Sequence, residues 1–374
     1  MKLVHSIVVV VATAGLLVGA AATQGQPPNE GATERFLTAR AVPSGADLRT
    51  EPAFGDGQDC GLLCSPRPGP GLYAGADFLL IRPHFSEAVA FAQGVQTLTT
   101  FQTEGRPLAF DYAPSFRAFG GFRFDDGRAA IEFNYRHVRG ETQVDGTAPG
   151  AGEFIVDPFG NVVGAVVVVD PRDARFGTMV VGGDLIRTEA TVQMNVYDLD
   201  LMRSFSPEDP RWDFRWSAGV RIADINQFYE SVITLQGSPL TRGDFSVDFI
   251  GAGPRLGLEG RRYFGAEGRF SLFANARAAL LVGTYDVASS NTVTPVGFSA
   301  SQRESMTRTI PVVETEVGAA WRVTDSLNLS AGWSFEAWFD LGTSGGQFGG
   351  FFAGADDANI MSLDGLFVRA EWRF

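Results

Sequence analysis

The chain has almost no lysine and very little histidine or cysteine. Lys2 is the only lysine among 374 residues, beside three histidines and two cysteines, and the 43 acidic residues give a net charge of −13. An acidic chain with no basic cluster is a poor candidate for nucleic-acid binding. Because metal sites in proteins need several suitably spaced ligands, and the histidines are scattered, the sequence predicts neither a metal nor a cofactor.

Long apolar runs are also missing, apart from the N-terminus. No later run reaches the ~18 residues that a membrane helix needs. At the start, Lys2 precedes the apolar stretch Ile7–Leu17, and small residues follow up to Ala22. This pattern predicts a secretory signal peptide over residues 1–22, with an uncleaved signal anchor as the alternative. Its removal leaves 29 arginines against 43 acidic residues, a net charge of −14.

Residues 23–70 differ in composition from the rest of the chain. They hold seven of the 19 prolines, together with many glycines and small polar residues. We interpret this stretch as a flexible periplasmic linker, since it has few apolar residues with which to form a core. Cys60 and Cys64 lie within it, and in an oxidising periplasm they could close a small local disulfide or remain as two free thiols.

The end of the chain alternates strictly between apolar and polar residues. From Leu366 to the terminal Phe374 every second residue is apolar, and Arg369, Glu371 and Arg373 lie between them. A period of two puts these sets on opposite faces of a β-strand. A chain that ends on an aromatic residue after such a strand resembles bacterial outer-membrane β-barrels. That resemblance implies that the barrel assembly machinery recognises the last strand, through Trp372 and Phe374.

Nine further segments alternate in the same way. They cover residues 72–80, 115–124, 131–136, 197–201, 214–222, 250–259, 270–282, 313–323 and 327–337. Short connections (125–128, 206–211, 265–268 and 324–326) alternate with long ones (82–113, 139–189, 227–244, 284–308 and 342–360). Short periplasmic turns and long outer loops are typical of outer-membrane barrels. We therefore predict an all-β, transmembrane, antiparallel up-and-down β-barrel over residues 71–374, with about ten strands. The apolar runs 162–169 and 178–181 leave twelve strands as the alternative.

Charged residues collect on the parity that faces inward. We interpret the following as pore-lining: Arg117, Arg123, Glu132, Arg136, Asp198, Asp200, Arg215, Arg221, Arg255, Glu259, Arg277, Glu314, Glu316, Arg322, Glu336, Arg369 and Glu371. Asp77 and Arg373 share this parity. Facing lipid, each arginine would cost about 2–4 kcal/mol, so these side chains must face a lumen. They either line a water-filled pore or pair across a narrow lumen; inward glycines favour the pore, although they could also serve bends in the strands.

Aromatic residues lie near the ends of the predicted strands. Trp212, Trp321 and Trp372 lie near the periplasmic ends, and Tyr135 and Trp338 lie near the outer ends. These positions suit the two aromatic girdles of a membrane barrel.

One resemblance is more specific. The segments WSAGVRIADI from Trp216, DFIGAGPRLGLEG from Asp248 and FSLFANARAALLVG from Phe270 resemble pore-forming outer-membrane proteins similar to the Legionella major outer membrane protein. The similarity extends over about residues 71–374. It implies a porin-like role in the outer membrane of a Gram-negative cell and brings no catalytic residues to this chain.

The favoured hypothesis is a passive pore for small hydrophilic solutes or ions, and not an enzyme. Its partners would be the lipid bilayer with lipopolysaccharide, the assembly machinery and the solutes, and a homo-oligomer is left open. The alternative is a closed surface barrel that acts through its outer loops as an adhesin or receptor. A minor alternative is a barrel enzyme that uses His137, at the outer end of the third strand.

Overall fold

A computed structural model describes the C-terminal part of the chain. The described residues are 70–86, 89–97, 101–124, 128–147, 154–156, 162–169, 185–205, 209, 211–235, 238–265, 268–294, 297–341 and 360–374. All of them belong to one compact unit, Leu62–Phe374. The predicted signal peptide, the predicted linker with its two cysteines, and the run 178–181 lie outside them. Within this described part, no helix is long and apolar enough to cross a membrane.

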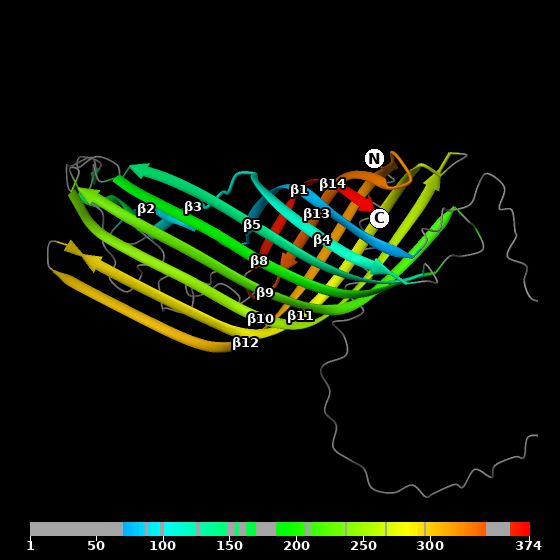
Figure 1. Ribbon diagram of the computed structural model, residues 1–374. Coiled ribbons are helices and arrows are strands. Elements are labelled where there is room, and N and C mark those ends of the chain that lie inside the picture. Colours follow the sequence, from blue (N-terminus) through cyan, green and yellow to red (C-terminus); the bar gives the residue numbers. More distant parts are fainter. Residues whose placement is uncertain are drawn as a thin grey trace, which may run out of the picture. The chain divides into compact units, whose positions relative to one another are not determined.

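Ten antiparallel strands close into a barrel, which confirms the predicted fold class (Figure 1). They are β1 (Gly71–Phe85), β4 (Ala113–Arg123), β5 (Ala129–Thr147), β8 (Leu185–Phe205), β9 (Trp212–Leu235), β10 (Ser238–Phe264), β11 (Phe270–Val293), β12 (Phe298–Arg322), β13 (Leu327–Trp338) and β14 (Met361–Arg373). Each strand pairs with its neighbours along the chain, and β14 pairs with β1 from Tyr73↔Arg373 to Phe85↔Met361. The last strand of the sequence therefore closes the barrel.

A separate four-stranded sheet lies in the two longest connections described. It contains β2 (Val89–Thr97), β3 (Phe101–Pro107), β6 (Phe154–Val156) and β7 (Val162–Val169), in the order β3-β2-β7-β6. The apolar run 162–169 thus forms a strand outside the barrel wall, and the alternative of twelve spanning strands is wrong for this run. The physical reason is its partner: β7 pairs with β2 and β6, and not with β5 or β8.

An apolar belt surrounds the outside of the barrel. Side chains such as Leu72, Leu256 and Val368 are more than half exposed, although they are strongly hydrophobic. Such a continuous belt would be an aggregation hazard in water but is the expected surface against lipid. The belt ends sharply in several strands: the outward positions after Ile222 and before Ile250 are Asp224 and Asp248.

Carboxylates mark this outer boundary of the belt. Asp248 on β10 lies directly opposite Asp286 on β11, and Asp224 on β9 pairs with the neighbouring Ile250. Partial burial, and then the charge of Asp286, raise the pKa of Asp248. Two carboxylates that lie directly opposite each other on neighbouring strands repel, and they are best tolerated where water reaches them.

The prediction of two of the long outer loops is wrong. Residues 227–244 and 284–308 continue as strands, so that only 236–237 separate β9 from β10 and only 294–297 separate β11 from β12. β10 is 27 residues long, whereas a strand needs only about 9–11 residues to cross a membrane. β5 and β8–β12 therefore extend together beyond the ends of β1, β4, β13 and β14 (Figure 1).

The extension has a hydrophobic interior. Beyond the belt the outward residues become polar, and the inward ones, such as Met194, Ile225 and Leu281, are fully buried and apolar. The pattern has inverted because the outside is now water and the inside is a packed core. The predicted short turns at the opposite end are confirmed: β4–β5, β8–β9, β10–β11 and β12–β13 are joined by residues 124–128, 206–211, 265–269 and 323–326.

Inward glycines do not leave open space. A Cβ atom added to Gly75 would lie 2.4 Å from the ring of Phe119, and one added to Gly365 would lie 2.0 Å from the carbonyl oxygen of Leu80. These glycines allow rings and neighbouring strands to approach closely. They therefore serve the packing of the strands, the alternative to an open pore. Trp338 is likewise fully buried inside the barrel, so its assignment to an aromatic girdle was wrong; it shares the inward parity of Glu336.

Candidate functional site

Twelve charged side chains meet inside the membrane-spanning part of the barrel, and we call them the lumen network. They are Asp77, Arg117, Arg136, Asp198, Asp200, Arg221, Arg255, Arg277, Glu314, Glu316, Glu336 and Arg369. The list holds six arginines and six carboxylates, so the formal charges cancel. Burial without partners would be prohibitive for any of them, and every member has at least one opposite charge within reach.

One half of the network is organised around Asp77 and Glu316. The Asp77 carboxylate accepts hydrogen bonds from Arg117 Nε at 2.6 Å and from Arg369 Nε at 2.9 Å. Glu316 lies 2.5 Å from Arg117 Nη1 and 3.4 Å from Arg369 Nη2. Two arginines and two carboxylates thus form a closed ring of contacts between β1, β4, β12 and β14.

Arg221 is the centre of the other half. Its Nε and Nη2 atoms donate to the two carboxylate oxygens of Asp198, at 2.7 and 2.8 Å, in a bidentate pair. Its Nη1 atom contacts Glu314 and lies 3.4 Å from Glu336. The Arg221 side chain is 2% exposed. One cation therefore contacts three carboxylates that water hardly reaches.

Further contacts complete this half. Arg255 bonds to Asp200 and to Glu314, the latter at 2.9 Å, and Arg136 Nη2 donates to Glu336 at 2.7 Å. Arg277 lies 3.9 Å from both Glu314 and Glu316. Arg277 is therefore the loosest member, and it links the two halves.

The contacts cross the lumen rather than follow its wall. Arg136 is on β5 and Glu336 is on β13, four strands apart in the order of the barrel, and Arg221 on β9 is also four strands from Glu336. In a ten-stranded barrel, five strands separate opposite walls. The network thus fills the cross-section in this structure, as the predicted alternative of a paired, narrow lumen requires.

A second charged layer lies nearer the short turns. Tyr73 donates to Glu132 at 3.0 Å, Glu371 accepts from Arg123 at 3.2 Å and from Arg373 at 3.0 Å, and Arg261 donates to Glu259 at 3.0 Å. Arg215 lies 4.0 Å from Glu259, and Arg322 is at the end of β12, half-buried. The structure thus brings most of the predicted pore-lining residues together in two layers.

Sequence reasoning missed what closes the outer mouth. The connection between β1 and β4, whose described residues are 86, 89–97 and 101–112, folds back against the interior of the extended strands; we call it the strap. Its Ala90, Leu108 and Phe110 are buried in the same hydrophobic cluster as Met194 and Ile225. No signal in the sequence could have located it, because Thr188 and Tyr229, which bond to its Ala90, lie in segments that the sequence predicts to be loops.

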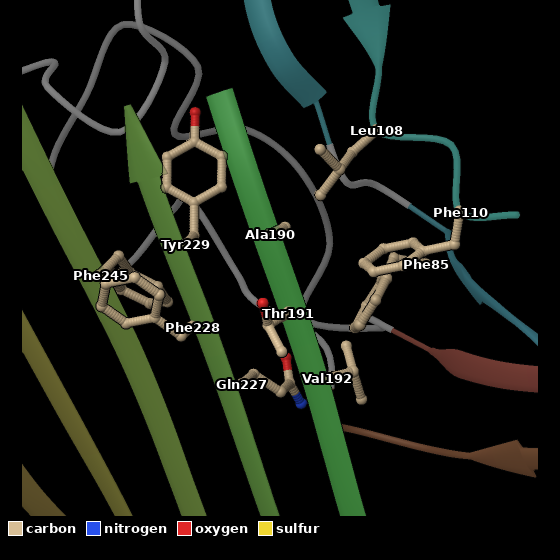
Figure 2. Close-up of a pocket in the computed structure, with 10 residues that line it drawn as sticks. All are labelled: Phe85, Leu108, Phe110, Ala190, Thr191, Val192, Gln227, Phe228, Tyr229 and Phe245. Carbon is tan, nitrogen blue, oxygen red and sulfur yellow. The ribbon is translucent and has the colours of Figure 1, made fainter. Parts of the chain in front are cut away.

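Hydrogen bonds tether the strap to the wall. The carbonyl oxygen of Ala90 accepts from Tyr229 Oη at 2.6 Å and from Thr188 Oγ1 at 3.3 Å. The connection after β13 is held in the same way, since Gln227 Nε2 donates to the carbonyl oxygen of Leu341 at 2.8 Å. Buried polar side chains of β8 and β9, of which Figure 2 shows Gln227 and Tyr229, therefore hold Ala90 and Leu341 against the inner surface of the extended strands.

His137, on which the enzyme hypothesis depends, faces outward. Its Nδ1 atom lies 3.0 Å from Asn195 Oδ1, and its ring lies 5.8 Å from that of Phe116. Over the ranges that the structure describes, no three His, Cys, Asp or Glu side chains are arranged to hold a metal ion. The charges of the barrel are instead gathered in the lumen.

Comparisons with known proteins place this chain in a family. The family model described as "Legionella pneumophila major outer membrane protein precursor" matches residues 65–374. Among curated proteins, none matches this chain in sequence. The outer membrane protease OmpT from Escherichia coli is 10% identical, with a TM-score of 0.40, over 81% of this chain and 97% of OmpT. Neisserial surface protein A is 10% identical, with a TM-score of 0.26, over 82% of this chain and all of that protein. The attachment invasion locus protein Ail of Yersinia pestis is 9% identical, with a TM-score of 0.20, over 81% and 99% of the two chains.

Proposed function

Since this chain belongs to the Legionella pneumophila major outer membrane protein family, we propose that it is a narrow, charge-lined pore of the outer membrane, which admits small ions or hydrophilic solutes when the ion pairs of its lumen exchange partners. The lumen network is the observation that carries this proposal. Replacing a buried ion-pair network by apolar side chains is often neutral or stabilising, so packing alone does not require twelve charges. A lumen that must solvate ions does require them.

Partner exchange is feasible because several members share partners. Glu314 is within contact distance of Arg221, Arg255 and Arg277, while Glu316 is within contact distance of Arg117, Arg277 and Arg369. A carboxylate that loses one arginine still has another within reach. An ion that enters the network therefore meets no isolated buried charge, which keeps the cost of rearrangement low.

The second candidate is a closed surface barrel that acts through its outer connections as an adhesin or receptor. One observation favours it: the lumen is filled, by the network at membrane depth and by the strap with its apolar partners beyond it. A closed barrel would never conduct, whereas a gated pore would open at intervals.

Single-channel recording of the refolded protein in a planar bilayer separates the two candidates. We expect small discrete current steps, and in a salt gradient we expect Glu316→Gln to shift the reversal potential toward anions, since it removes one lumen carboxylate. Glu189→Gln is the matched control, because Glu189 lies on the outer surface of β8. A folded protein that shows no current would favour the closed barrel. An equal shift in both variants would contradict the proposal that the lumen network sets the ion preference.

The C-terminal strand carries a second proposal, which concerns assembly. Trp372 and Phe374 are both at least half exposed on the apolar belt, and the Phe374 amide donates to the carbonyl oxygen of Leu72 at 2.9 Å. We propose that the assembly machinery recognises this aromatic end before β14 closes onto β1.

Deletion of Phe374 is expected to lower severalfold the amount of folded barrel in the outer membrane, measured as the heat-modifiable band of outer-membrane fractions. Phe374→Tyr is the control and should retain wild-type levels, because it keeps an aromatic ring at the end of the strand. Normal levels of the deletion variant would argue against recognition of this residue.

A further inference from the structure

Two arginines face outward at the end of the barrel that carries the short turns. Arg203 on β8 and Arg262 on β10 each lie two residues before the end of their strand, on the face that carries the apolar belt, and both side chains are exposed. Arg203 lies opposite Trp216 of β9, and Arg262 lies opposite Trp212 of the same strand. The two arginines therefore flank β9 on the lipid-facing surface (Figure 1).

Neither of these arginines has a carboxylate partner among the described residues. The arginines of the lumen network, by contrast, each contact a carboxylate, and on the water-exposed extension Arg187 pairs with Asp145 and Arg242 pairs with Glu230. A guanidinium carries five N–H donors, which need acceptors at the edge of the hydrocarbon region as elsewhere. The surface thus presents positive charge that the protein itself does not neutralise.

Aromatic rings surround one of these cations. The guanidinium carbon of Arg262 lies 5.3 Å from the centre of the Trp212 ring and 5.4 Å from that of Phe264. Phe214, on the strand between the two arginines, stacks on Trp212 at 5.8 Å and on Phe205 at 5.6 Å. Aromatic girdles lie at the level of the lipid headgroups, so the cation beside these rings lies at the level of the phosphates. We call the following residues the rim patch: Arg203, Trp212, Phe214, Arg262 and Phe264.

The outward charge of these strands has opposite signs at the two boundaries of the belt. Asp224, Asp248 and Asp286 lie at the outer boundary, on β9, β10 and β11, whereas the arginines of the rim patch lie at the boundary near the short turns. A headgroup with a net negative charge is repelled by the first set and attracted by the second. The short turns of an outer-membrane barrel face the periplasm, so the attraction acts in the periplasmic leaflet.

We propose that the rim patch binds the headgroup of an anionic phospholipid in the periplasmic leaflet. The guanidinium groups donate to phosphate oxygens, for which their planar fork is well suited, and the rings cover the glycerol and the start of the acyl chains. A zwitterionic headgroup carries an ammonium group that the arginines repel, so the patch selects a lipid with a net negative charge. The site does not depend on whether the barrel conducts, because its residues face away from the lumen.

The test is native mass spectrometry of the refolded protein in detergent, mixed with equal amounts of phosphatidylglycerol and phosphatidylcholine that have the same acyl chains. We expect the protein to retain about tenfold more phosphatidylglycerol, since each arginine near a membrane surface raises the affinity for anionic lipid severalfold. In the double variant Arg203→Gln, Arg262→Gln the ratio of the two retained lipids should fall to about onefold, because glutamine keeps a polar side chain without the charge.

The double variant Arg187→Gln, Arg242→Gln is the matched control. It removes the same charge from exposed arginines of the outer extension, beyond the membrane, and should keep the wild-type ratio. A heat-modifiable band shows that each variant is folded. Equal retention of the two lipids by the wild-type protein, or a preference that survives in Arg203→Gln, Arg262→Gln, would overturn the proposal. An equal loss in the control would overturn it too, because net charge and not the rim patch would then select the lipid.

Discussion

Arg221→Met is expected to lower the free energy of unfolding of the barrel by about 3–5 kcal/mol, the usual effect of removing one partner from a buried ion pair. Methionine fills a similar volume without charge, so packing is largely conserved. Asp198, Glu314 and Glu336 would be left with Arg136 and Arg255 as close partners, and with Arg277 at 3.9 Å from Glu314. Three carboxylates would then share two close cations where water is nearly absent, and the urea midpoint of the refolded protein should fall accordingly.

Arg187→Met is the matched control for this prediction. Arg187 makes a comparable contact, with its Nε atom 3.0 Å from Asp145, but both side chains are more than half exposed on the outer extension. Exposed ion pairs contribute about 0–1 kcal/mol, so this variant should unfold close to the wild-type midpoint. Equal midpoints for both variants would show that water enters the network freely, and the description of Arg221 as a buried centre would then be wrong.

The members of the lumen network could be predicted from the sequence, but the contacts between them could not. The alternation of apolar and charged residues along the strands assigns Arg117 and Glu316 to the interior, because neither side chain is tolerated against lipid. The contact between them joins residues 199 positions apart across four strands of the barrel. That pairing depends on the number of strands and on their stagger, and a pattern with a period of two contains no information on stagger.

The two wrong loop predictions have one common physical cause. The alternation of β9 continues past Ile222, but its sense reverses: Asp224 and Asn226 face outward, and Ile225 faces inward. A rule that expects apolar residues outside ends the strand at that point and predicts a loop. The strand instead leaves the bilayer there, and the solvent on its outer face changes from lipid to water. The reversal therefore marks the outer surface of the membrane more sharply than the ends of the strands do.

The same reversal gives the extension its own hydrophobic core, and with it a means of closing the proposed pore. Inward apolar residues such as Val247 and Val287 need a cover, because β13 and β14 do not reach them. The strap provides part of that cover through Ala90, Leu108 and Phe110. The strap is thus needed to bury apolar residues of the extension, and it also obstructs the lumen. The stability of the extension and the closure of the lumen are therefore coupled.

Replacing residues 87–111 by an eight-residue glycine–serine linker is therefore expected to raise the single-channel conductance severalfold. The variant keeps Ser86, whose backbone and hydroxyl bond to Ile360, and it keeps β4, in which Ala113 pairs with Ile81. Ser86 follows Ile81 by five positions along the chain, about 17 Å, which an eight-residue linker can span. The lumen network is untouched, so ion preference should remain that of the wild type while the current rises.

The double variant Thr188→Val, Tyr229→Phe tests the same idea without a deletion. It removes both hydroxyls that hold the Ala90 carbonyl oxygen but leaves the strap in the chain. We expect more frequent openings at an unchanged maximal conductance, since a loosened strap still occupies the mouth part of the time. Thr234→Val is the control, because its hydroxyl bonds to Leu185 on the exposed surface, away from the strap. If the deletion conducts no more than the wild type, the resistance lies entirely in the charged layers, and the strap serves only to cover the core.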